Sequence, residues 1–348
     1  MLRLGAVLMV LCSALMHFVP AAAAESFYDN RQVTIIVGYG PGGAYDLYAR
    51  MLARHMGKYI SGKPNFTVQN MPGAGSLRAA NYLYSSAPAD GATFGIFARN
   101  MPLLSILGVN PAVKFDAHKF TWIGSASNYQ EDAYLFFVRP DVPIRSVADL
   151  QRRDTPALPV GGTAQGASGN DVPILLRDVL GLNMRLVPGY PDAGALYLAM
   201  ERGEIDGRAT DMSGVMSGRP QWLDPQNGMR VVLQFGRATR HPNFPDVPTA
   251  RELAPDAAAR AIIEAAEMPY LMSRPFAAPP RVPSDRAAIL RTAFLSALSD
   301  TALQAEAEKM GLGLTPVSGE NISELLDSML QIPQQARDYL RVLMKENQ

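Results

Sequence analysis

Val33-Thr-Ile-Ile-Val-Gly-Tyr-Gly-Pro-Gly-Gly-Ala-Tyr-Asp46 is the stretch that decides the fold class. Its first residues form a short β-branched run, which predicts a buried strand, and a glycine-rich turn follows. An amphipathic pattern begins at Leu47 and predicts a helix. Unpaired backbone N–H groups converge at such a helix start, and the helix dipole makes that place attractive to an anion. We therefore expect an α/β protein with an anion site at this turn.

The same pattern occurs twice more. Residues 66–70 lead into Met71-Pro-Gly-Ala-Gly-Ser76, and residues 158–160 lead into Gly161-Gly-Thr-Ala-Gln-Gly-Ala-Ser-Gly169. Further apolar runs alternate with helical patterns, which indicates βαβ units and parallel sheets covered by helices. The other predicted strands are residues 93–97, 134–138, 184–188, 205–209 and 229–235, and the helices are 47–60, 76–86, 172–180 and 195–202. From residue 284 onward the chain is predicted to be mainly helical.

The first residues are typical of an export signal. Arg3 precedes an apolar run over residues 4–15, and Ala22-Ala23-Ala24 offers a cleavage site. We expect residues 1–24 to be a signal peptide that is cleaved after Ala24. Cys12 is the only cysteine and lies in this segment, so the exported chain has no disulfide and no thiol nucleophile. The 32 Lys and Arg residues balance 32 Asp and Glu residues, which does not favour a nucleic-acid partner.

The exported part is long enough for two domains, and no flexible linker separates them. We therefore predict two α/β lobes joined by crossover strands that act as hinges, at residues 123–129 and 231–236. Residues 25–128 and 237–348 would form lobe 1, and residues 129–236 would form lobe 2.

Several motifs in this order resemble one known family. They are Pro41-Gly-Gly-Ala-Tyr-Asp46, Asn70-Met-Pro-Gly-Ala-Gly75 and Pro245-Asp-Val-Pro-Thr249. Together they resemble the substrate-binding receptors of tripartite tricarboxylate transporters, also called Bug proteins, over essentially the whole exported chain. The resemblance implies a two-lobed periplasmic-binding-protein fold, type II-like, with a ligand cleft between the lobes. It also implies a periplasmic receptor, expected to be a monomer, that takes a small carboxylate to integral membrane permease subunits and needs no cofactor or metal.

In this family, backbone amides and ordered waters of the βα loops hold the carboxylate. The aromatic residues of the first loop are predicted to form a wall for the ligand body, and Arg99 and Asn100 to meet a second polar end. The candidate ligand-binding residues are Tyr39, Gly43, Ala44, Tyr45, Asp46, Gly75, Ser76, Arg99, Asn100, Thr163, Ala167, Ser168, Asn170 and Asp211. The chain departs from the family at Ser76, where glycine is usual, and at residues 189–192, so we expect carboxylate capture to be shared rather than the whole ligand.

Other interpretations are weighed against this one. Gly38-Tyr-Gly-Pro-Gly-Gly43 fits a dinucleotide fingerprint, but residues 47–89 hold no Asp or Glu to bind a ribose. Asp46 has two open roles, a ligand contact or a favourable charge at the helix start. Asp206 and Asp211 flank a strand as paired carboxylates do, yet capping or polar contacts in the cleft between the lobes are the simpler roles for them. No nucleophile motif or metal-ligand spacing is present, so a non-enzyme is predicted. A ligand sensor for a membrane signalling protein and an exported enzyme acting on a carboxylate remain alternatives.

Overall fold

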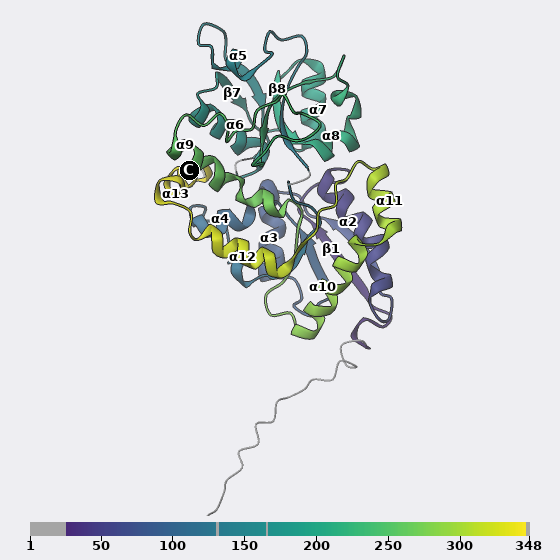
Figure 1. Cartoon of the computed structure of the whole chain (residues 1–348). Helices are drawn as coiled ribbons and strands as arrows, with labels where there is room; N and C mark the ends of the chain where they lie inside the picture. The colour runs from purple at the N-terminus through teal and green to yellow at the C-terminus, as the bar shows by residue number, and fades with distance from the viewer. Residues whose placement is uncertain (1–25, 130–131, 165, 346–348) are drawn as a thin grey trace, which may run out of the picture.

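The computed structural model describes residues 26–129, 132–164 and 166–345 and shows two α/β lobes, one above the other in Figure 1. The expected two-lobed fold with one sheet in each lobe is confirmed. The predicted signal peptide over residues 1–24 lies outside the described residues. Within the described part of the chain, no helix combines the length and the apolar character needed to cross a membrane.

The first lobe is built on a six-stranded sheet with the order β11-β4-β10-β3-β1-β2. β1 pairs in parallel with β2 and β3, whereas β10 is antiparallel to β3 and β4. Val33, Ile35 and Val37 of β1 pack into one core and Ile36 into another, as the alternation of side chains along a strand requires. The strands are β1 (Gln32–Val37), β2 (Asn65–Asn70), β3 (Thr93–Ile96), β4 (Thr121–Ser125), β10 (Pro275–Ala278) and β11 (Val317–Ser318).

The helices of this part of the chain follow the glycine-rich turns and fill its last third. They are α2 (Ala44–His55), α3 (Leu77–Ser85), α4 (Met101–Leu107), α10 (Ser284–Leu298), α11 (Thr301–Lys309), α12 (Gly319–Met329) and α13 (Gln334–Met344). The helix predicted over residues 47–60 starts at Ala44 and passes into a 3₁₀ turn at Met56–Tyr59. Pro333 stands directly before α13 and lacks the N–H that would continue α12, which explains the break between them.

The second lobe is built on a five-stranded sheet with the order β7-β6-β8-β5-β9. β6 pairs in parallel with β7 and β8, and β5 is antiparallel to β8 and β9. Its strands are β5 (Tyr134–Val138), β6 (Leu158–Gly161), β7 (Met184–Val187), β8 (Gly207–Asp211) and β9 (Arg230–Phe235). The helices that follow or cover them are α5 (Val147–Gln151), α6 (Ser168–Leu180), α7 (Ala193–Arg202), α8 (Met212–Gly218) and α9 (Ala257–Glu267).

Two chain segments run side by side between the sheets. Ala126 N–H donates to Arg274 O at 3.1 Å, Tyr129 N–H to Tyr270 O at 3.1 Å, and Ser273 N–H to Ser127 O at 2.9 Å. The first segment lies where the outgoing crossover was predicted. The return differs, because β9 is a full strand paired with β5 and the Gln234–Thr249 bridge keeps the following segment beside it. We therefore assign the return crossing to residues 268–274, and the exact lobe limits stay a proposal.

The C-terminal helix α13 joins the two lobes on the side of the junction away from α2 and α8 (Figure 1). Arg341 Nε donates to Leu107 O of α4 at 3.2 Å, and Tyr339 Oη donates to Asp178 Oδ2 of α6 at 3.3 Å. α4 follows a strand of the first sheet and α6 a strand of the second. α13 therefore packs on both lobes at once.

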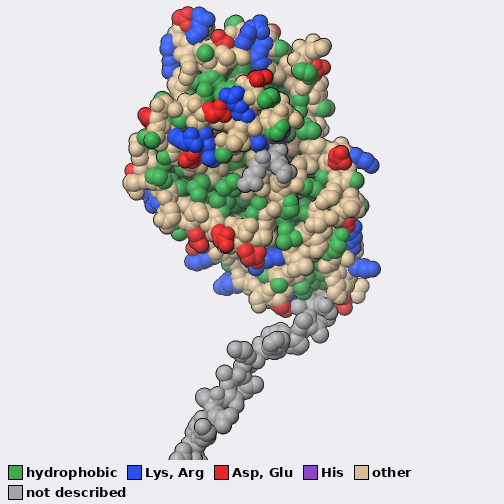
Figure 2. Space-filling model, viewed as in Figure 1, with side chains coloured by type: hydrophobic (Ala, Val, Ile, Leu, Met, Phe, Trp, Pro, Cys, Tyr) green, Lys and Arg blue, Asp and Glu red, His purple; other side chains and the backbone are tan. Residues whose placement is uncertain are grey.

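The charges on the visible face are mixed. Figure 2 shows Lys and Arg side chains beside Asp and Glu side chains over both lobes, with green apolar side chains gathered at the waist between them. This face lacks the one-signed basic surface that is typical of nucleic-acid binders.

Candidate functional site

A cleft of about 600 Å³ lies between the lobes. Its walls come from the loops that follow β1, β2 and β3 in one lobe and β6, β7 and β8 in the other. This volume is within the range of sites for small organic molecules. The predicted site residues that line it are Tyr39, Gly43, Ala44, Tyr45, Gly75, Ser76, Arg99, Thr163, Ala167, Ser168 and Asp211.

Asp46 does not line the cleft but anchors its first loop. Its side chain is 1% exposed, and its Oδ2 accepts hydrogen bonds from Gly42 N–H at 2.9 Å and Arg50 Nε at 2.8 Å. Its Oδ1 accepts one from Asn70 Nδ2 at 2.8 Å, which ties the end of β2 to the start of α2. Burial acts to raise the pKa of Asp46, but the hydrogen bonds from Arg50, Gly42 and Asn70 lower it overall. Of its two open roles, the geometry favours the structural one.

The second loop adopts an unusual backbone. Gly73, Ala74, Gly75 and Ser76 all have positive φ, with Ser76 at 91°. Non-glycine residues pay for this conformation, and such strain concentrates at ligand sites. The Ser76 Oγ accepts a hydrogen bond from Ala98 N–H at 3.0 Å, and it also lies 1.8 Å from where a Cβ on Gly38 would stand. The first and second loops therefore fit together only with glycine at position 38.

Asn100 and Asn170 are buried behind the wall of the cleft rather than on it. Asn100 is 5% exposed, and its Oδ1 accepts a hydrogen bond from Ser168 Oγ at 3.2 Å. Asn170 is 4% exposed within the first turn of α6. Asn100 therefore connects the lobes through Ser168, and neither asparagine reaches the cleft in this structure.

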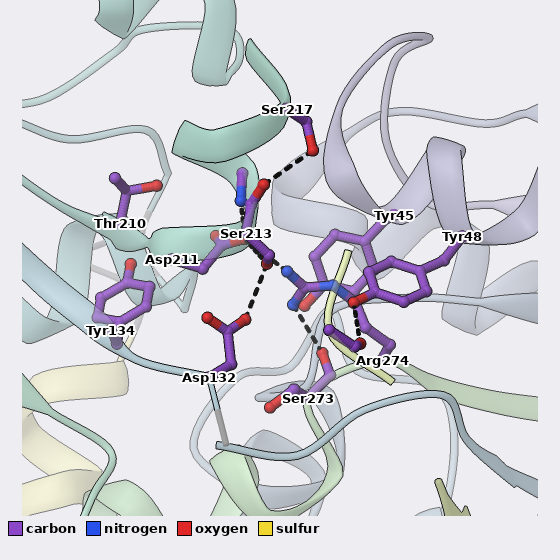
Figure 3. Close-up of polar contacts among 12 residues, drawn as sticks. Tyr45, Tyr48, Asp132, Tyr134, Thr210, Asp211, Ser213, Ser217, Ser273 and Arg274 are labelled. Carbon is purple, nitrogen blue, oxygen red and sulfur yellow. Dashed lines mark hydrogen bonds and ion pairs between the residues drawn. The ribbon is translucent and has the colours of Figure 1, made fainter. Parts of the chain in front are cut away.

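Asp211 lines the cleft, with its side chain 16% exposed, and forms an ion pair with a buried arginine that the sequence did not indicate (Figure 3). Arg274 is fully buried, and its Nη2 donates to Asp211 Oδ2 at 2.5 Å. The same carboxylate caps α8 through Gly214 N–H at 3.2 Å. Burial acts to raise the pKa of Asp211, but the charges of Arg274, Arg99 and Arg208 outweigh it and lower the pKa to about 2.

Asp132 is a buried carboxylate close to this pair, as Figure 3 shows. Its Oδ2 accepts a hydrogen bond from Ser213 Oγ at 2.8 Å, and Ser213 Oγ lies 3.2 Å from Asp211 Oδ2. Burial and the negative charge of Asp211 raise the pKa of Asp132. The two carboxylates share one serine hydroxyl and the nearby positive charge of Arg274.

Arg99 lines the cleft from the first lobe and is held among aromatic rings. Its Cζ lies 5.0, 5.6 and 4.8 Å from the ring centres of Tyr129, Tyr134 and Tyr270. The side chain is nearly buried, and its Nη1 has no hydrogen-bond partner. Among the described residues, no carboxylate forms an ion pair with it. The sequence placed Arg99 at the cleft, but it did not show that three tyrosines from distant segments converge on it.

Arg208 lines the cleft from the second lobe and was not predicted. Its Nη1 donates to Ala193 O at 2.9 Å, and its Nη2 donates to Thr210 Oγ1 at 3.2 Å. Side-chain alternation along β8 puts positions 208 and 210 on one face of the strand. Nothing in the sequence indicated that this face borders the cleft.

The arrangement suits the binding of an anion. Asp206, weighed as a partner of Asp211, instead lies 3.4 Å from Arg139, so the two carboxylates serve different partners. No group of three or more His, Cys, Asp or Glu side chains in the described ranges is placed to hold a metal ion. What the cleft offers is backbone amides, tyrosine rings and two buried guanidinium groups.

Asp171, in the first turn of α6, makes the stability of the protein depend on pH. It is 3% exposed in the first turn of α6, and burial raises its pKa to about 7, although Gly166 N–H and Asn170 donate to it and lower it. In the unfolded chain its pKa is near 3.8. Between these values the folded state keeps a proton that the unfolded state has lost, so stability falls as the pH rises, by up to about 1.4 kcal/mol per unit.

The variant Asp171→Asn removes this ionisation. We expect it to flatten the decline in the free energy of unfolding between about pH 4 and pH 7. At pH 8 the variant should have the higher free energy of unfolding. Urea unfolding of both proteins at pH 5, 6.5 and 8 measures the effect. Parallel pH profiles for the two proteins would contradict it.

The chain is similar in sequence to several curated proteins. No family model matches it. It is 27% identical over 250 residues to a UPF0065 protein of Bordetella pertussis, covering 69% of this chain and 71% of the relative. It is 25% identical over 242 residues to the protein BugT of the same organism, covering 68% and 69%. These relatives confirm the resemblance drawn from the loop motifs.

Solved structures share the fold. The periplasmic binding protein BugD superimposes with a TM-score of 0.72 at 17% identity, over 92% of this chain and 100% of that one. MatC of Rhodopseudomonas palustris, solved with bound malate, gives 0.68 at 20% identity over 88% and 98%. A further R. palustris protein, solved with adipate, gives 0.69 at 22% identity over 88% and 97%.

Proposed function

We propose that this chain, which belongs to the Bug family of binding proteins, is a periplasmic receptor that captures a small organic acid between its lobes and delivers it to a tripartite tricarboxylate-type permease. The observation that carries the proposal is the pair of buried arginines on the cleft wall, Arg99 and Arg208, which have no carboxylate partner among the described residues. A buried cation is costly unless an anion accompanies it, and a ligand carboxylate supplies that anion.

The first carboxylate is assigned to the lobe-1 loops. Gly43, Ala44 and Gly75 line the cleft there, and Arg99 follows β3 at the same edge of the sheet. Ser76 also lines it, but its N–H already donates to Gly73 O at 3.0 Å. Parallel strands β1, β2 and β3 direct their carboxyl ends to this edge, which is where ligands bind in open α/β sheets. Thr163 and Ser168 approach from lobe 2, so the ligand is enclosed when the lobes close.

The neighbours solved with malate and adipate support a carboxylate as the ligand class, and the absence of turnover is part of the proposal. We propose export to the periplasm, a monomeric state and a permease partner because of the family resemblance. A signalling receptor would use the same cleft, and only its membrane partner would differ.

Thermal unfolding against a panel of organic acids tests the function. We expect one class of acid to stabilise the refolded, ligand-free protein, because a ligand at 100 times its Kd adds about 2.7 kcal/mol, or roughly 5 °C for a chain of this size. Isothermal titration then gives the Kd, and mass spectrometry of the recovered acid checks that it is unchanged. A panel without any shift would contradict the receptor function, and conversion of the acid would indicate an enzyme.

A further inference from the structure

Arg208 is held in place without a direct ion pair among the described residues, although its charge acts on Asp211 from a distance. Its guanidinium lies 4.2 Å from the ring centre of Tyr197, and that ring packs edge-on against Trp222 with centres 5.0 Å apart. The hydrogen bonds to Ala193 O and Thr210 Oγ1 use two of the five N–H groups of a guanidinium. Its buried Nε has no partner. The cation is therefore fixed in orientation and still has donors to offer.

The carboxylates near Arg208 are already engaged. Asp211 pairs with Arg274, and Asp192 caps α7 by accepting from Ala195 N–H at 2.9 Å. Elsewhere in this protein a buried charge is paired directly, as the Glu267 carboxylate is with the partly buried Arg251. Arg208 is 5% exposed and has no ion pair within the described parts of the chain. A structural salt bridge therefore does not account for it.

Arg208 and the lobe-1 loops face the same cleft from different lobes. We propose that Arg208 binds a second anionic group of the ligand, so that the cleft selects compact dianions over acids with one charge. The inference rests on the proposed function, since it assumes a first carboxylate on the lobe-1 loops. A ligand charged at both ends then touches both lobes and stabilises their closed arrangement, whereas an acid with a neutral second end gains only the first contact.

Titration with matched ligands tests this selection. Each dicarboxylate of three to six carbons is compared with its monoamide, which keeps the shape and removes one charge, and 3-sulfopropanoate is compared with succinate to distinguish the two anion chemistries. We expect the wild type to bind its preferred dianion at least tenfold more tightly than the matched neutral-ended acid. Arg208→Met should weaken dianion binding about 10- to 100-fold, the range of a charge-assisted hydrogen bond, and change monoamide binding less than about threefold.

The control variant is Arg202→Met, which removes a positive charge from α7 at a side chain that is 68% exposed. It should change neither Kd more than about twofold. Arg208→Gln, which keeps an N–H donor without the charge, is measured alongside and should also lose the discrimination. Retained monoamide binding shows that the cleft of either variant is folded.

Equal affinities of the wild type for a dianion and its monoamide would overturn the inference. An equal loss of affinity for both ligands in Arg208→Met would overturn it too. Those results leave the receptor function standing. Failure of every acid to bind the wild type would instead remove the proposed function.

Discussion

Arg274→Met is expected to lower the free energy of unfolding by about 3–5 kcal/mol, the cost of removing one partner from a buried ion pair. Arg274 is fully buried, and the Asp211 carboxylate it contacts faces the junction of the lobes. The variant leaves that carboxylate with a serine hydroxyl and one N–H group as nearest donors. At about 2 °C per kcal/mol, the unfolding temperature should fall by roughly 6–10 °C.

The pH dependence identifies the cause. In the wild type the pKa of Asp211 is lowered to about 2, so the pair stabilises the fold above about pH 4 and the contribution is lost as the pH falls toward 2. In the variant, burial without the cation makes ionisation unfavourable, so protonation relieves it. The difference between the two proteins should therefore be largest near neutral pH and shrink in acid, as urea unfolding at pH 7 and pH 4 would show.

A double-mutant cycle with Asp211→Asn completes this test, because the second change removes the stranded charge. We expect a coupling free energy of about 1–3 kcal/mol. Arg260→Met is the control, since Arg260 is exposed and pairs with Glu264 within one helix, a contact worth only a few tenths of a kcal/mol. An unfolding temperature of Arg274→Met within 2 °C of the wild type would contradict the assignment.

Arg99→Met should have its largest effect on binding. Truncating one side of a buried charge pair costs about 2–5 kcal/mol, which weakens the Kd roughly 30- to several-thousand-fold. We expect every organic acid that the wild type binds to be affected, because Arg99 faces the carboxylate that all of them share. Isothermal titration of the variant with the best ligand and with its monoamide measures the loss.

The stability of this variant should change less than that of Arg274→Met. No described carboxylate loses a directly bonded partner, although Asp211 loses the more distant charge of Arg99. The relief of a buried charge offsets the lost contacts with three tyrosine rings. Arg78→Met is the matched control, since Arg78 is exposed beside the second loop and outside the cleft. Its Kd should stay within about threefold of the wild type. Wild-type affinity in Arg99→Met would remove this residue from the site.

The sequence predicted the parts of the site that depend on local pattern. The β1 strand, its glycine-rich turn and the start of α2 follow from residues 33–46, because strand period, glycine turn and helix dipole act over a few positions. The two later loops were found by the same reasoning. That 11 of the 14 candidate residues border the cleft reflects this local origin.

The rest depends on contacts between distant segments. Arg274 lies 63 positions from Asp211, and no pattern in either segment indicates that they meet. Asn100 and Asn170 are neighbours of lining residues, yet each turns into packed structure at the start of a helix. To predict that Arg208 lines the cleft, one must know which face of β8 borders the other lobe. The arrangement of the two sheets decides this.

The C-terminal helix has a kinetic consequence. Since α13 packs on α4 and α6 together, we expect the lobes to separate by rotating about the side of the junction that this helix holds. Binding and release of an acid then share one opening step, and the rate of this step does not depend on the ligand concentration. In stopped-flow experiments the observed association rate should level off at high acid concentration. Ending the chain at residue 333, which removes α13, should raise that plateau.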